Sequence, residues 1–290
     1  MKRSGFIAAA AAAALSPVTA CAAAFSRIEA IARTVPGVLG VTCRTLGDGP
    51  PVFEYNPNVV FPTASTIKML IMTAAFLAED NAPGALDERI TWHREDLIGG
   101  SDFMSIQPDG QRFSVRELIV PMIQLSDNTA SNLLITHFGF EAINAAGKRA
   151  GMERTRLARH FLDYSAIVRH NDNVSTPGDM ATLLLQIGRG AHEGTDTIVS
   201  SEHCRRMVKI MLGQTDRDKI PEGLPSRVAV ANKTGEIEGT RNDVAIVSPF
   251  GDSPYVLTCF TKWLTDYGPA YSAIHRVARL SYQLAGTYSG

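Results

Sequence analysis

The spacing of hydrophobic residues divides the chain into segments with different periods. Apolar residues at helical spacing predict a helix over residues 25–35, and alternation then predicts a strand hairpin formed by residues 38–46 and 52–55. From residue 65 the period changes to that of helices, which predicts helical segments at 65–79, 115–125, 129–138, 141–150, 177–189 and 201–213. Strand patterns return at 227–233, 243–247 and 255–261, and a final helix is predicted over 270–285.

The order of these segments predicts how the chain is organised. Two-stranded hairpins are marginally stable alone, so the strands at the two ends of the chain must share one sheet. We therefore expect an α/β lobe built from residues 25–61 and 214–290, with an all-helical lobe of residues 62–213 inserted between them. Together they form a single catalytic domain, 25–290, and the cleft between the lobes is the natural place for a site.

The first 24 residues have the pattern of a signal peptide. Lys2 and Arg3 precede an apolar stretch at 6–15, and small residues follow, which is the order of a secretory signal. Cleavage after Ala24 predicts a periplasmic or secreted protein. The segment ending at Cys21 also fits a bacterial lipobox, so a lipoprotein anchored at Cys21 is the alternative. No later stretch is long and apolar enough to span a bilayer.

Composition removes several classes of function. Lys and Arg number 28 against 29 Asp and Glu, a net charge of −1, without the basic excess that nucleic-acid binding requires. The seven histidines lack metal-ligand spacing and no phosphate-binding glycine loop is present, so we expect no metal and no cofactor. A monomer is expected. Cys43 and Cys259 fall on strands expected to be neighbours, which leaves a disulfide or free buried thiols open.

One lysine interrupts an otherwise apolar helix. Lys68 lies among Ile67, Met69 and Leu70, in a helix whose apolar surroundings predict burial. Burial lowers the pKa of a lysine, and Ser65 lies on the same helical face three positions earlier. A hydroxyl beside such an amine, at a helix N-terminus, is what an activated serine nucleophile needs. The alternative is that Ser65 merely caps the helix while Lys68 reaches solvent.

Two further motifs favour the catalytic interpretation. Ser126-Asp127-Asn128 lies at a junction between two predicted helices, where capping would explain one polar residue but not three. Lys233-Thr234-Gly235 is predicted to end a strand, with the glycine in the following turn. Each motif is weak alone, but the three occur in one fixed order.

In that order the motifs form the signature of penicillin-recognising serine hydrolases. The chain resembles a class A β-lactamase from Phe25 to its end. The resemblance implies the β-lactamase/transpeptidase-like fold, an antiparallel five-stranded sheet flanked by helices with an inserted helical lobe. It also implies a small-molecule β-lactam substrate, hydrolysis of the lactam amide bond and resistance to such antibiotics.

The resemblance assigns the acylation machinery. Ser65 attacks the lactam carbonyl and forms an acyl-enzyme, and Lys68 is a candidate base, although the acylating base is disputed in this family. The backbone N–H groups of Ser65 and Glu236 would receive the oxyanion. Ser126 would pass a proton to the leaving nitrogen.

The resemblance also assigns substrate binding. Asn128 would hydrogen-bond the side-chain amide of the substrate. Lys233, Thr234, Gly235 and Arg241 would gather its carboxylate, with the two cations supplying charge-assisted bonds.

The chain departs from the family pattern at the base that activates the deacylating water. When Arg159 is aligned with the family arginine, Phe161 stands where the glutamate belongs. The nearest acid is Asp163, which we expect to assist deacylation. The departure keeps two alternatives open: a D-Ala-D-Ala peptidase or other serine amidase or esterase, and a penicillin-binding sensor that acylates without hydrolysis.

Overall fold

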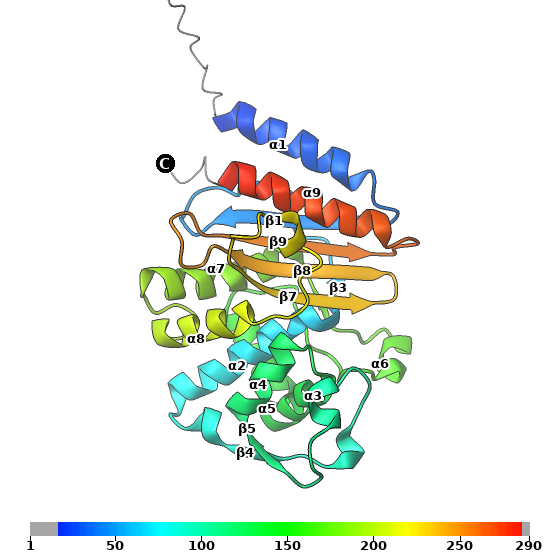
Figure 1. The fold of residues 1–290 in the computed structure, drawn as a ribbon, viewed down its shortest axis with the longest axis vertical. Helices are drawn as coiled ribbons and strands as arrows, with labels where there is room; N and C mark the ends of the chain where they lie inside the picture. The colour runs from blue at the N-terminus through cyan, green and yellow to red at the C-terminus, as the bar shows by residue number, and fades with distance from the viewer. Residues whose placement is uncertain (1–16, 286–290) are drawn as a thin grey trace, which may run out of the picture.

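A five-stranded antiparallel sheet forms the centre of the α/β lobe (Figure 1). The computed structural model describes residues 17–285. The strand order is β2-β1-β9-β8-β7, so strands from both ends of the chain share the sheet, as predicted. Its strands are β1 (Val38–Thr45), β2 (Phe53–Tyr55), β7 (Val230–Ile237), β8 (Thr240–Val247) and β9 (Tyr255–Lys262).

The sheet separates two hydrophobic cores. Successive side chains of a strand point to opposite faces, and β8 shows the consequence. Ala245 and Val247 pack into the core under α1 (Pro17–Ala32) and α9 (Gly268–Ala285). Val244 and Ile246 pack into the core shared with the helical lobe. The sheet residues are therefore buried on both faces.

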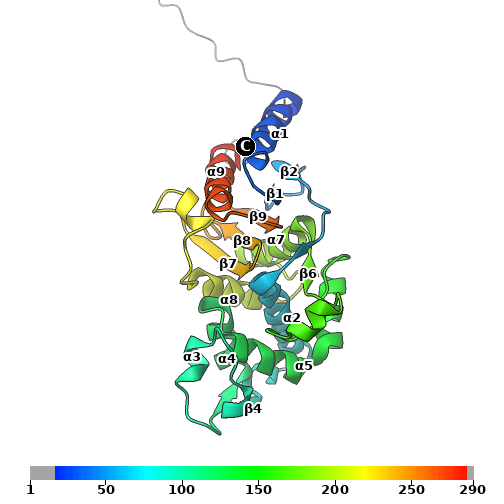
Figure 2. The ribbon, with the colours of Figure 1, turned by 90° about the vertical axis from the view of Figure 1, so that its right-hand side faces the viewer.

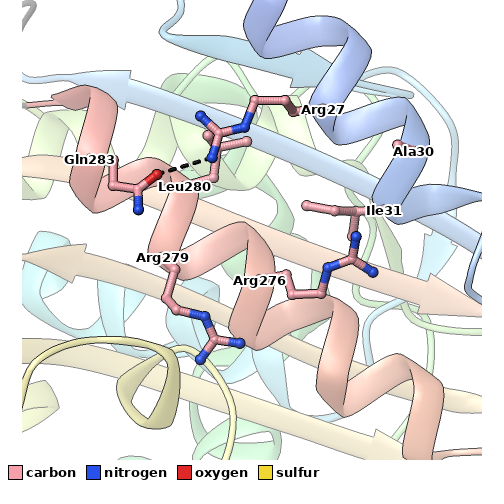
Figure 3. A pocket seen from close by; sticks show the side chains of 7 residues that line it. All are labelled: Arg27, Ala30, Ile31, Arg276, Arg279, Leu280 and Gln283. Carbon is pink, nitrogen blue, oxygen red and sulfur yellow. Dashed lines mark hydrogen bonds between the residues drawn. The ribbon is translucent and has the colours of Figure 1, made fainter.

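Helices cover both sides of the sheet (Figure 2). Helices α1 and α9 lie side by side on one face, and in the groove between them Arg27 of α1 donates to Gln283 of α9 at 3.0 Å (Figure 3). Helix α7 (Pro177–Glu193) packs on the other face against β1, β8 and β9, and α8 (Ser201–Leu212) packs against β7.

The inserted lobe is built around the apolar helix α2 (Lys68–Asn81), which packs against α5 and α4. The other elements of the inserted segment are β3 (Phe61–Pro62), η1 (Ala64–Ile67), η2 (Ala85–Asp87), β4 (Arg89–Thr91), η3 (Arg94–Asp96), α3 (Asp102–Ser105), β5 (Arg112–Ser114), α4 (Val115–Gln124), α5 (Asn128–Arg149), α6 (Tyr164–Val168) and β6 (Val174–Ser175). A short 3-10 helix, η4 (Pro221–Gly223), precedes β7. Gly139 interrupts α5 with non-helical angles, close to the break predicted between residues 138 and 141.

Two predicted boundaries are wrong. The Lys233-Thr234-Gly235 motif does not end a strand, because β7 continues to Ile237 and pairs with β8 across a turn at Glu238-Gly239. Gly235 is required by a close approach and not by a turn, since a Cβ there would lie 2.7 Å from the carbonyl oxygen of Thr63. The helix predicted from residue 65 begins as the 3-10 helix η1 and becomes α-helical only at Lys68.

The cysteines and the N-terminus bear on the remaining predictions. Cys43, Cys204 and Cys259 are free and buried, so the disulfide alternative is not formed. The apolar part of the predicted signal peptide lies outside the described residues, and the predicted cleavage point after Ala24 falls within α1. Within residues 17–285, no helix has the length and hydrophobicity that crossing a membrane demands.

Candidate active site

Three of the predicted site residues line a cavity of about 530 Å³ where the two lobes meet. Ser65 of η1, Asn128 at the start of α5 and Glu236 of β7 contribute to its wall. Phe161 and the residues that follow it close the cavity from the loop before α6. Segments far apart in the sequence thus form one pocket.

Ser65 lies at the start of the buried helical segment and is itself half-buried. The preceding residue, Ala64, has a φ of 48°, a left-handed conformation that is uncommon for a residue with a side chain. Strand β7 lies directly against this turn, because a Cβ on Gly235 would come within 2.9 Å of the Ser65 nitrogen. This contact brings the strand that carries Glu236 to the backbone of Ser65, as an oxyanion hole requires.

Lys68 is fully buried, as its apolar surroundings predicted. Its ammonium nitrogen donates to the carbonyl oxygen of Ser126 at 2.6 Å, to the Ser126 hydroxyl at 3.1 Å and to Asn128 Oδ1 at 2.8 Å. Burial holds the pKa of Lys68 well below its usual range, the charge of Lys233 lowers it further, and Asp127 opposes the shift. A lowered pKa makes the neutral amine, the form that accepts a proton, easier to reach than in an exposed lysine.

Ser126 connects the two lysines of the motifs. Its hydroxyl lies 3.1 Å from the nitrogen of Lys68 and 3.0 Å from the nitrogen of Lys233, and its φ of 57° is again left-handed. Lys233 also donates to the carbonyl oxygen of Thr234 at 2.8 Å. Burial lowers the pKa of Lys233 to about 7. The geometry provides a proton path between Lys68 and Lys233 through one hydroxyl.

Phe161 covers Lys68 on its loop side. The Lys68 nitrogen lies 4.3 Å from the centroid of the Phe161 ring, within range of a cation–π contact. Asn132 fixes this position, because it accepts from the Phe161 N–H at 2.8 Å and donates to its carbonyl oxygen at 3.3 Å. The ion pair between Arg159 and Asp172, at 2.8 Å, closes the loop that carries the ring. An aromatic face therefore occupies the position beside Lys68 where the family pattern calls for a carboxylate.

The structure places Asp163 at the N-cap of α6. Asp163 is partly exposed, and its carboxylate accepts from the Ala166 N–H at 3.0 Å and the Ser165 hydroxyl at 2.7 Å. These hydrogen bonds lower the pKa of Asp163. Its role in deacylation stays a prediction.

Arg241 has partners of its own. Its guanidinium donates to the carbonyl oxygens of Ile237 at 3.0 Å and Thr240 at 2.7 Å, and lies 3.7 Å from the centroid of the Tyr267 ring. Its Nε is 3.6 Å from a carboxylate oxygen of Glu236. Arg241, predicted to bind the substrate carboxylate, therefore lies within ion-pair range of the Glu236 carboxylate, although its buried Nε has no hydrogen-bond partner.

Sequence reasoning missed a group beside this arginine. Lys219, Asp216 and Tyr271 all contact residues of β7 at this end of the cavity. The only sequence signal was the alternation Asp216-Arg217-Asp218-Lys219, which an exposed loop would show equally well.

The fold and the clustered lysines and serines define a serine hydrolase of the penicillin-recognising superfamily. A profile of the β-lactamase enzyme family matches residues 23–285. The chain therefore belongs to the β-lactamase enzyme family.

Individual relatives agree with this assignment. Beta-lactamase CTX-M-97 of Escherichia coli is 28% identical over 240 residues, covering 81% of this chain and 80% of the relative. The β-lactamase from Sphaerobacter thermophilus is similar in structure, with a TM-score of 0.78 at 28% identity over 90% of this chain and 96% of that one. A structure of PBP-A matches with the same score, identity and coverage.

Proposed function

We propose that the protein is a serine β-lactamase that opens the lactam ring through an acyl-enzyme at Ser65 and hydrolyses that intermediate slowly. One observation carries the proposal: Lys68 and Lys233, both buried, lie within hydrogen-bond distance of the same Ser126 hydroxyl, and Lys68 also donates to Asn128, which lines the cavity together with Ser65. Such an arrangement can take a proton from one atom of a substrate complex and return it to another.

The acylation half of the proposed reaction uses these residues as follows. The Ser65 hydroxyl attacks the lactam carbonyl and loses its proton to neutral Lys68. The N–H groups of Ser65 and Glu236 stabilise the oxyanion, and removal of one such donor costs about 3–4 kcal/mol in known hydrolases. The proton then passes through Ser126 to the lactam nitrogen as the carbon–nitrogen bond breaks.

The hydrolysis half of the proposed reaction needs a base to activate water. A water molecule must lose a proton as it attacks the Ser65 ester, and Phe161 offers no base where the family pattern has one. We propose that Asp163, the acid nearest to Phe161 in the loop sequence, assists this step. The acyl-enzyme is therefore expected to persist much longer than in a β-lactamase that has the loop glutamate.

A second candidate function is favoured by the same phenylalanine. A D-Ala-D-Ala peptidase or another serine amidase or esterase, or a penicillin-binding sensor, would use the Ser65 machinery without fast lactam hydrolysis. PBP-A is similar to this chain, and a structure of one of its mutants is described as an acyl-enzyme complex with penicillin G.

The mass of the intact protein, followed over time after penicillin is added, tests the proposal. We expect a mass increase equal to one penicillin, followed by slow return to the original mass and by measurable nitrocefin turnover. Ser65→Ala is the control and should show no increase. A permanent adduct without turnover would refute the hydrolase and leave a penicillin-binding protein. Cleavage of acyl-D-Ala-D-Ala peptides in preference to lactams would identify the peptidase.

The remaining proposals concern the mature protein. We propose that it is exported, as a periplasmic or secreted monomer beginning at Phe25, with a lipid anchor at Cys21 as the alternative. The mass of the protein purified from cells distinguishes these two N-termini, because lipidation adds acyl chains to Cys21.

A further inference from the structure

Glu236, which lines the cavity, belongs to a charged group built around Lys219. The Lys219 side chain is fully buried, and its nitrogen lies 3.0 Å from Asp216, 2.7 Å from Asp218 and 2.6 Å from Glu236, measured to carboxylate oxygens. The same oxygen of Glu236 accepts from the Tyr271 hydroxyl at 2.7 Å. A buried ammonium is stabilised only when paired, and three carboxylates already pair with this one.

Glu236 joins this group to the second cation. One of its carboxylate oxygens contacts Lys219, and the other lies 3.6 Å from Nε of Arg241. The Arg241 side chain, only 15% exposed, is further held by two carbonyl oxygens of its own hairpin. Glu236 therefore lies between two cations, Lys219 and Arg241.

Thr234 lies beside the same charged group as Glu236. Positions 234 and 236 lie on one face of β7, because side chains alternate along a strand. The Thr234 side chain helps to lower the pKa of Asp216, whose carboxylate also pairs with Lys219. Lys219 thus pairs with Asp216, Asp218 and Glu236, and Arg241 pairs with Glu236 alone. These five side chains sum to a formal charge of −1, and the buried Lys233 lies outside this count although Asp216 and Glu236 act on it.

We propose that Glu236 is a specificity-determining residue whose carboxylate takes the place of the substrate carboxylate, so that this end of the site disfavours acyl donors carrying a negative charge there and favours uncharged ones. The inference rests on the proposed reaction at Ser65 and narrows its substrate class. Penicillins carry a carboxylate next to the lactam nitrogen, and in their methyl esters this group is uncharged. Comparing a penicillin with its methyl ester therefore measures the effect of this one charge on acylation.

The experiment measures the second-order rate constant of acylation for benzylpenicillin and for its methyl ester. In the unmodified protein we expect the ester to react at least as fast as the free acid. Glu236→Gln should raise the rate constant for the acid about tenfold relative to the ester, since a hydrogen bond to a charged group contributes about that factor. The gain should appear in KM and not in kcat. Glu222→Gln, which removes an equal charge from an exposed residue in the η4 turn, is the matched control.

A double variant keeps the test specific. Adding Arg241→Ala to Glu236→Gln should remove most of the gain, because the freed guanidinium is then absent. An unchanged acid-to-ester ratio in Glu236→Gln, or an equal change in Glu222→Gln, would overturn the role of Glu236 while leaving the Ser65 reaction intact. Absence of acylation by both compounds in the unmodified protein would instead refute the proposed function, and this inference with it.

Discussion

Replacing Phe161 with glutamate places a carboxylate where the aromatic ring now covers Lys68. The ring centroid is 4.3 Å from the lysine nitrogen, and Asn132 holds the backbone of residue 161 through both its N–H and its carbonyl group. The new side chain should therefore start from the same backbone position. It can serve as the general base that the deacylating water lacks.

The size of the effect follows from the distance. Two unit charges about 4 Å apart interact by ~4 kcal/mol at the effective dielectric constant of ~20 suited to protein sites. A carboxylate at position 161 would thus raise the pKa of Lys68 and keep it an ammonium. A positioned general base contributes about 10²–10⁴-fold to a rate, so we expect deacylation to accelerate by at least ~100-fold.

Single-turnover mass spectrometry after penicillin addition measures this rate directly. Phe161→Leu is the control, because it removes the ring without adding a base and should leave hydrolysis slow. Circular dichroism and the melting temperature establish that each variant is folded. A folded Phe161→Glu protein whose acyl-enzyme decays no faster than that of Phe161→Leu would refute the reasoning.

Three further predictions address the loop, the strand and the pH dependence. Asp163→Asn keeps the helix cap, since Asn caps as well as Asp, and should slow decay of the acyl-enzyme; an unchanged decay rate removes Asp163 from the mechanism. Gly235→Ala forces a Cβ to within 2.7 Å of a Thr63 backbone oxygen. The variant should lose about 1–3 kcal/mol of unfolding free energy, measured by denaturant titration, and should also lose acylation. A fully stable and active variant would contradict the close packing. Burial lowers the pKa of Lys233 to about 7. Between pH 7 and about 10 the unfolded chain therefore binds more protons than the folded one, so Lys233 should make the free energy of unfolding rise by up to ~1.4 kcal/mol per pH unit. Lys233→Met should flatten that rise, and an identical slope in both proteins would contradict the prediction.

Much of the fold was predictable because the spacing of hydrophobic residues indicates where the helices and strands lie. The strand patterns at residues 243–247 and 255–261 match β8 and β9, which bury both faces between two cores. The start of β8 was missed. Thr240–Asn242 is polar, so the pattern shows no strand there, yet these residues pair with Gly235–Ile237 through their backbones. Backbone pairing of polar residues leaves no hydrophobic signal.

Part of the candidate site was also predictable from the sequence, and part was not. The role of Lys68 was predictable because a lysine buried in an apolar helix needs polar partners. In the structure these partners are Ser126 and Asn128. The contacts of Glu236 could not be predicted. They depend on Lys219 and Tyr271, which lie in segments whose separation from β7 no spacing rule specifies.

The phenylalanine at position 161 affects the two halves of the proposed reaction in opposite directions. A carboxylate beside Lys68 would hold its proton, whereas the aromatic ring attracts the ammonium more weakly than a charge would, and burial and Lys233 lower the lysine's pKa. Neutral Lys68 is the form that can accept the Ser65 proton, so the substitution favours acylation. The same ring withholds the base that hydrolysis needs. A site with these two properties reacts with its acyl donor readily and releases the acyl group slowly, which is why the lifetime of the Ser65 ester is the quantity that distinguishes the candidate functions.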